Sequence, residues 1–357
     1  MTGRVGGKNS RWNALGTAKA LRRPADSRSP GEKIHTLTDC PTLRSVLRLW
    51  RTPVVVWAGL GILSIAVMVW ILGRWIIHGG LHSASASGYQ ISTENKVISW
   101  AAQVVIVVVV LTCGWFLFRA SRKQGRMTFY SLLFVGYGTT FWMDPIFNWG
   151  HLRFTQNRYA LNVATWGPYI PGWHSDYSGG QVESLITGGG LAYLLGFLWI
   201  AVPVAVLDLI GRRFPTWQMG RLNLFQATII IFVTAALFDL VLETVAVRTG
   251  AYSYTGAAGP ALFAGHWYQY PLSVLAYAIV LTIPAGLLIR YSRRGRQDVW
   301  ILKGSDRLPE RACPWMRLLA GIGFANLQIL VVICVCAVTL GWAPLQSDTP
   351  SYLTPFI

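Results

Sequence analysis

Seven apolar runs, each long enough to cross a bilayer, dominate the hydrophobic pattern of the chain. At 1.5 Å per residue, about 20 helical residues span the roughly 30 Å hydrocarbon core. The pattern therefore predicts an all-α fold, a polytopic membrane helix bundle over residues 51–345. Pro203 and Pro284 fall inside two runs, which membrane helices tolerate because neighbouring groups bond the freed backbone. The predicted spans are 53–73, 97–118, 128–148, 187–209, 223–246, 266–289 and 319–342.

Basic residues collect in alternate segments between these runs. Of the 31 Lys and Arg residues, 26 lie in the stretch before the first run or in the connections after the second, fourth and sixth runs. Cytoplasmic loops carry such an excess of positive charge. We therefore predict a cytoplasmic N-terminus, a C-terminal tail (346–357) outside, and residence in the cell membrane.

Composition supports this class of protein and limits the partners. The chain of 357 residues is 53% hydrophobic and 13% charged, whereas soluble domains carry about 25% charged residues. The net charge of +17 follows mostly from topology, and it favours anionic lipid headgroups at the basic face. No aromatic and basic stacking pattern indicates nucleic-acid binding. Residues 1–50, rich in Arg, Ser, Pro and Gly, are expected to form a disordered cytoplasmic tail.

The connection between the third and fourth runs, residues 149–186, differs from the basic loops. It is long and rich in Trp, Tyr, Pro, Gly and Asn. A disordered linker would lack so many aromatic residues. We expect a folded cap, or a re-entrant segment, over the outer ends of the helices.

Carboxylates within apolar runs are costly, which makes each of them a functional hypothesis. Asp144 ends the third run in the stretch "FWMDPIFNWGH", where Pro145 should bias it toward extended backbone. Asp239 and Glu243 are four residues apart, on one helical face. Because two such carboxyls in a low dielectric resist double ionisation, one should hold a proton near neutrality. Topology places all three near the outer surface.

These three carboxyls are the predicted catalytic residues, although structural roles remain open. In the structural alternative, Asp144 ends a kinked helix, Glu243 forms an ion pair with Arg248, and Asp239 forms a hydrogen bond to a neighbouring helix. Asp208, beside the basic inner loop, is expected to form an interfacial ion pair instead.

Other side chains at the same predicted depth are candidates for substrate binding, although aromatic residues there first form an interfacial belt. They are Asn148, Trp149, His151, Trp166, Trp173, His174, Asp176, Glu183, Tyr252 and His266. The five cysteines have no metal-ligand spacing, and the histidines do not recur at i, i+4. No phosphate-binding loop or dinucleotide motif occurs, so we expect neither a metal nor another cofactor. The stretch "TGGGLAYLLG" is interpreted as close helix packing.

The blocks "RMTFYSLLFVGYGTTFWMDPIFNWG" and "WGPYIPGWHSDYSGG" resemble the AveC family of spirocyclases, most clearly over residues 126–200. These are multi-pass membrane proteins named for an enzyme that closes a spiroketal from a dihydroxy-ketone polyketide. The resemblance implies a membrane cyclase of secondary metabolism. It assigns no catalytic residue.

Acid-catalysed dehydrative ring closure of a hydrophobic polyketide-like substrate, through an oxocarbenium ion, is therefore the expected reaction. It needs a carboxylic acid and a nearby carboxylate. Asp239 and Glu243 would supply them, while Asp144 and Asn148 would orient hydroxyls. A membrane terpene cyclase would use the same groups to protonate an olefin or epoxide. A non-catalytic transporter or lipid-binding protein is the third alternative, although no internal repeat is evident.

Overall fold

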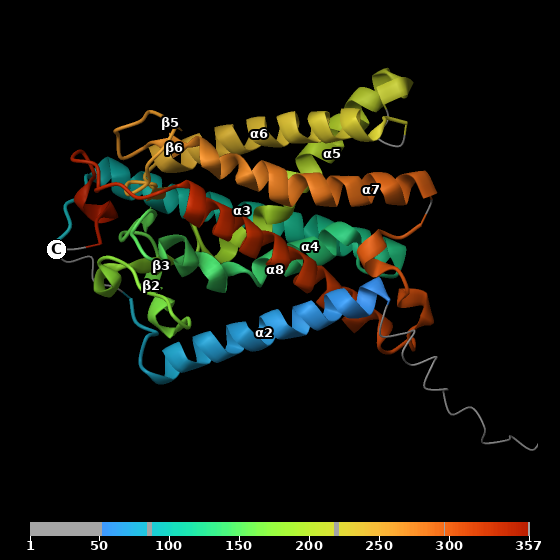
Figure 1. The fold of residues 1–357 in the computed structure, drawn as a ribbon, viewed down its shortest axis with the longest axis horizontal. Helices are drawn as coiled ribbons and strands as arrows, with labels where there is room; N and C mark the ends of the chain where they lie inside the picture. Colours follow the sequence, from blue (N-terminus) through green and yellow to red (C-terminus); the bar gives the residue numbers. More distant parts are fainter. Residues whose placement is uncertain (1–51, 84–87, 218–220, 296, 356–357) are drawn as a thin grey trace, which may run out of the picture. The chain divides into compact units, whose positions relative to one another are not determined.

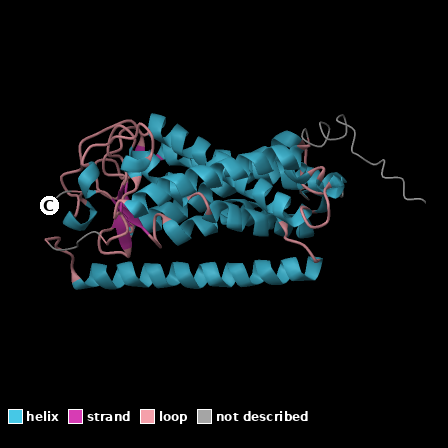
Figure 2. Cartoon of the chain, turned by 90° about the horizontal axis from the view of Figure 1, so that it is seen from below, coloured by secondary structure: helices cyan, strands magenta, loops and turns pink. Residues whose placement is uncertain are grey.

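The computed structural model describes residues 52–83, 88–217, 221–295 and 297–355. The predicted basic tail, with Cys40, lies outside these residues. The other four cysteines are free thiols. Within the described residues, long helices run beside one another, and the short strands gather with the loops at one end of them (Figures 1 and 2).

Within the described ranges, six helices are long and apolar enough to cross a membrane. Their bounds are Pro53–Ile77, Thr93–Gln124, Gly190–Arg213, Leu224–Arg248, Leu272–Gly295 and Cys313–Thr339. They correspond to six of the seven predicted spans, which fits a membrane protein. Two predicted starts are wrong, because 187–189 and 266–271 form turns and a strand before their helices begin. The side of each terminus stays a prediction.

The third predicted span is not one continuous helix. The helix α4 (Phe129–Gly138) ends where the hydroxyls of Thr139 and Thr140 donate to the carbonyls of Gly136 and Tyr137. The tighter 3-10 helix η1 (Phe141–Asn148) follows and contains Pro145. The total of seven spans therefore stays a prediction. Asp144 lies inside η1, so the expected extended backbone at this residue is wrong.

Local sequence explains where several helices begin and end. Pro53 opens α2 (Pro53–Ile77), where its missing N–H costs no hydrogen bond. Ser92 caps α3 (Thr93–Gln124), which ends at Gly125 in the left-handed conformation. Asn223 and Gln226 form a capping box at the start of α6 (Leu224–Arg248).

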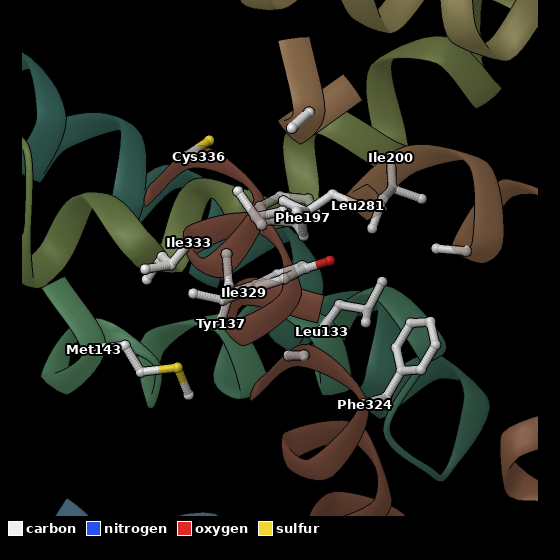
Figure 3. Packing of buried hydrophobic residues seen from close by; sticks show 14 of the residues in the cluster. Leu133, Tyr137, Met143, Phe197, Ile200, Leu281, Phe324, Ile329, Ile333 and Cys336 are labelled. Carbon is white, nitrogen blue, oxygen red and sulfur yellow. The ribbon is translucent and has the colours of Figure 1, made fainter. Parts of the chain in front are cut away.

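The helix α8 (Cys313–Thr339) is the centre of the packing. It contacts α2, α4 and η1, and the segment from η6 (Leu272–Leu275) through the π-helix η7 (Ala278–Thr282). Figure 3 shows Tyr137 of α4 close to Leu133 and Ile329 in this core, and its hydroxyl donates to Gln328 Oε1 at 2.8 Å. The helix η4 (Gly190–Phe197) packs on α4, while α5 (Leu198–Arg213) and α7 (Ile283–Gly295) pack with α6.

Residues 149–186 are ordered by short antiparallel ribbons. The strand β1 (Thr155–Gln156) pairs with β4 (Tyr252–Ser253), and β2 (Asn162–Ala164) pairs with β3 (Val182–Ser184). A third ribbon joins β5 (Ala261–Leu262) to β6 (Tyr270–Pro271). The β1–β4 ribbon ties the segment after η1 to the segment after α6.

Candidate active site

Two pairs of buried carboxyl groups lie beside the β1–β4 ribbon. Asp144 and Glu183 form the first pair, and Asp239 and Glu243 form the second. Each of the four side chains belongs to a residue less than 9% exposed. Buried carboxyls require hydrogen-bond partners, because an unpaired charge in a low dielectric is costly. Both pairs meet this requirement with neutral donors.

In the first pair, Gln156 of β1 joins the two carboxyls. Its Nε2 donates to Asp144 Oδ2 at 2.5 Å and to Glu183 Oε2 at 3.0 Å. The Tyr193 hydroxyl donates to Asp144 Oδ1 at 2.6 Å, and the Thr165 hydroxyl donates to Glu183 Oε1 at 2.5 Å. Burial, with the neighbouring charge of Asp144, raises the pKa of Glu183 well above its usual range. Glu183 is thus the candidate of this pair to hold a proton.

In the second pair, aromatic donors hold both carboxyls. Trp199 Nε1 and the Tyr270 hydroxyl donate to Asp239, at 2.7 and 2.6 Å. The hydroxyls of Tyr252 and Tyr254 donate to Glu243 Oε2, at 2.8 and 3.1 Å. All these partners come from α5 and the segment after α6. Asp239 and Glu243 continue a buried stripe along α6 that recurs every fourth residue: Ala227, Ile231, Ala235, Asp239, Glu243 and Val247.

Glycines let the backbone approach both pairs closely. Gly188 has φ +67°, and a Cβ there would lie 3.0 Å from the Tyr252 ring. A Cβ at Gly189 would lie 3.1 Å from Asp144 Oδ2. The predicted close packing of "TGGGLAYLLG" therefore occurs. Its first two glycines, however, pack on the Tyr252 ring and on the Asp144 carboxyl. Further along, Gly196 packs closely against Tyr137 of α4.

A cavity of about 20 Å³ adjoins the first pair. Asp144, Gln156 and Glu183 line it, together with residues 353–355 of the C-terminal segment. The Thr155 hydroxyl, which also lines it, is buried without a hydrogen-bond partner among the described residues. This volume admits one small polar group and no polyketide chain.

The other candidate residues divide into buried supports and surface groups. Trp166 Nε1 and Trp173 Nε1 donate to the carbonyls of Trp142 and Pro145, each at 2.7 Å, and so hold η1 in place. Asn148 Oδ1 accepts from the backbone N–H groups of Arg153 and Phe154. Asn148 also lines the small cavity.

The three candidate histidines lie at the exposed surface rather than among the carboxyl pairs. His151 Nδ1 is 3.1 Å from Asp176, and His266 Nδ1 is 3.0 Å from Asp348. His174 contacts the Gly172 carbonyl, and Trp149 is 36% exposed. Their predicted roles in binding substrate gain no geometric support. Among the described residues, no group of three or more His, Cys, Asp or Glu side chains is placed to hold a metal ion.

Of the two expected ion pairs, that of Asp208 forms and that of Glu243 with Arg248 does not. Asp208 pairs with Arg293 of α7. The Arg248 guanidinium lies 3.8 Å from the centroid of the Tyr268 ring, while Glu243 bonds tyrosines. The alternative, structural role of Asp239, a hydrogen bond to a neighbouring helix, is present through Trp199.

The model of the family described as "Spirocyclase AveC-like" matches residues 122–353. The match covers more than half of the chain and extends well beyond the stretch of clearest resemblance, 126–200. It includes all four carboxyls and the tyrosines that hold them. No curated protein and no solved structure matches the chain. The chain belongs to the AveC-like spirocyclase family.

Proposed function

We propose that this protein is a membrane-embedded cyclase that closes a spiroketal from a hydrophobic dihydroxy ketone by acid catalysis. The observation that carries the proposal is the presence of two buried carboxyl pairs beside one ribbon, within the residues that match the family. A proton-holding carboxyl next to an ionised one is the minimal equipment for this reaction.

The reaction proceeds with a balanced transfer of protons. One hydroxyl of the substrate adds to the ketone and gives a cyclic hemiketal. A carboxylic acid protonates the hemiketal hydroxyl, the C–O bond breaks, and one water leaves. The second hydroxyl attacks the resulting oxocarbenium ion and gives its proton to a carboxylate. The net change is the loss of one water molecule.

The geometry favours Glu183 as the acid and Asp144 as the carboxylate of the first pair. Glu183 retains its proton because burial and the Asp144 charge raise its pKa. Asp144 accepts hydrogen bonds from Tyr193 and Gln156, which stabilise its ionised form. The ionised carboxyl of the second pair then stabilises the developing cation, because a negative group fixed in a low dielectric stabilises positive charge strongly. This division revises the expectation that Asp239 and Glu243 alone supply acid and base.

The test uses the full chain in lipid nanodiscs and a symmetrical ketone that carries a hydroxyl four carbons from the carbonyl on each side. We expect protein-dependent formation of the spiroketal above the rate in empty nanodiscs. Glu183→Gln and Asp144→Asn should each lower the rate at least about a hundredfold, the usual contribution of a general acid or base. Wild-type turnover in both variants would refute the assignment.

Deletion of the gene, followed by metabolite profiling, distinguishes the remaining functions. Accumulation of an uncyclised dihydroxy ketone supports the proposal. Accumulation of an uncyclised prenyl chain identifies a terpene cyclase. Unchanged metabolites, with substrate uptake into proteoliposomes, identify a transporter.

A further inference from the structure

Tyr277 lies beside the second carboxyl pair: its ring centroid is 6.4 Å from that of Trp199, whose Nε1 donates to Asp239 at 2.7 Å. No motif in the sequence indicates this residue. Its side chain interacts electrostatically with Asp144 of the first pair and with Asp239 and Glu243 of the second. Tyr193 and Tyr252, which hold the two pairs, also interact with it. The Tyr277 ring therefore packs on the Trp199 support of Asp239 and lies within electrostatic reach of both pairs.

The hydroxyl of Tyr277 differs from those of its neighbours. The hydroxyls of Tyr193, Tyr252, Tyr254 and Tyr270 each donate to a carboxyl oxygen. Tyr277 is half-buried, and its hydroxyl has no hydrogen-bond partner among the residues that the structure describes. A hydroxyl that is free amid satisfied groups remains available to a ligand.

The backbone fixes this ring by an irregular turn. Tyr277 immediately precedes the π-helix η7 (Ala278–Thr282), a wide turn often found at functional sites. Gln328 of α8 donates to the carbonyls of Val280 and Leu281, at 2.8 and 2.9 Å. The Thr282 hydroxyl donates to the Trp199 carbonyl at 2.9 Å. Two neighbouring helices thus hold the turn in place, which pre-organises the ring.

The surrounding charges define the ligand that fits. Three carboxyls near Tyr277 disfavour an anion, and a phenol hydroxyl bonds neutral carbonyl and hydroxyl oxygens equally well. We propose that the Tyr277 hydroxyl binds the reacting ketone or hydroxyl oxygen of the substrate, beside the second carboxyl pair. The ligand is a neutral chain that carries ketone or hydroxyl oxygens. The carbon attached to the bound oxygen becomes cationic during the reaction. The reaction at the bound carbon rests on the proposed function, whereas the binding of the substrate oxygen by Tyr277 does not.

A dibutyl ketone with a carbon-13 carbonyl is the probe, added to the full chain in lipid nanodiscs. A hydrogen bond lowers the infrared carbonyl frequency, so we expect a second, lower band that is absent from empty nanodiscs. Tyr277→Phe should abolish this band and weaken ketone affinity about three- to tenfold, the cost of one neutral hydrogen bond. Tyr291→Phe, on the same span but 55% exposed, is the matched control and should retain both.

A lower band that persists in Tyr277→Phe, or no such band in the wild type, overturns the inference. Because Tyr277 makes no hydrogen bond that the variant would lose, an unchanged thermal midpoint shows that the variant is folded. If the band depends on Tyr277 but the dihydroxy ketone is not cyclised, the binding site stands and the proposed function fails. Cyclisation without a Tyr277-dependent band refutes the binding site and leaves the proposed function standing.

Discussion

Gln156 and Tyr252 lie directly opposite each other in the β1–β4 ribbon, and each holds a different carboxyl pair. The Gln156 amide bonds Asp144 and Glu183, while the Tyr252 hydroxyl bonds Glu243. Opposite residues of an antiparallel pair project to the same face. The ribbon therefore places one support of each pair side by side, although the pairs come from distant parts of the chain.

Replacing Gln156 with Leu should destabilise the protein substantially. The change keeps the approximate volume but removes two hydrogen bonds to carboxyls and the acceptor for the Ser184 N–H. Because buried groups lose their partners, we expect a loss of about 3 kcal/mol or more in the free energy of unfolding. Denaturant titration in detergent measures this. The same change at Gln346, a half-buried residue of the C-terminal segment, is the control. Equal losses would show that the hydrogen bonds of Gln156 add no stability to the fold.

Glu183 should make both stability and activity decline as the pH rises. Its raised pKa means that the folded state binds this proton more tightly than the unfolded state. The resulting stabilisation is complete below the ordinary pKa of glutamate and is lost as the pH rises toward the raised value. The same deprotonation removes the proposed acid. Thermal midpoints and rates measured against pH should both fall, and Glu183→Gln should flatten the dependence of the midpoint. If the thermal midpoint of Glu183→Gln keeps the pH dependence of the wild type, that dependence comes from other groups.

Tyr252 and Tyr254 should act on Glu243 as a unit. Both hydroxyls donate to the same oxygen, Oε2, and the bond from Tyr252 is the shorter one. Each single Phe replacement leaves one donor, so we expect losses of about 1 kcal/mol. The double replacement removes both and should exceed the sum of the single losses by about 0.5–3 kcal/mol. A double-mutant cycle on unfolding free energies measures the excess, and strict additivity would contradict shared support of Glu243.

The sequence predicts the helical bundle and three catalytic candidates, because apolar length and costly buried charges leave local signals. Periodicity places Asp239 and Glu243 on one face, and both are buried on α6. The partners of these carboxyls leave no such signal. Gln156 and Tyr193 reach Asp144 through tertiary pairing of segments far apart in the chain. The break after Gly138 leaves no signal either, because the apolar run continues while the hydroxyls of Thr139 and Thr140 bond the last carbonyls of the helix.

The crossing of α2 and α8 should depend on Gly61 but not on Gly59. A Cβ at Gly61 would lie 2.1 Å from the Leu319 carbonyl oxygen, whereas Gly59 has no atom within 4 Å of its Cβ position. Small residues let membrane helices approach closely, and an added methyl group here forces α2 away from α8. We expect Gly61→Ala to cost about 1–3 kcal/mol, the range for overpacking, and Gly59→Ala to cost nearly nothing. Unfolding titrations in detergent compare the two variants. Equal stability would mean that the helices separate without loss, and a deficit at Gly59 would place an unrecognised partner on the exposed face of α2.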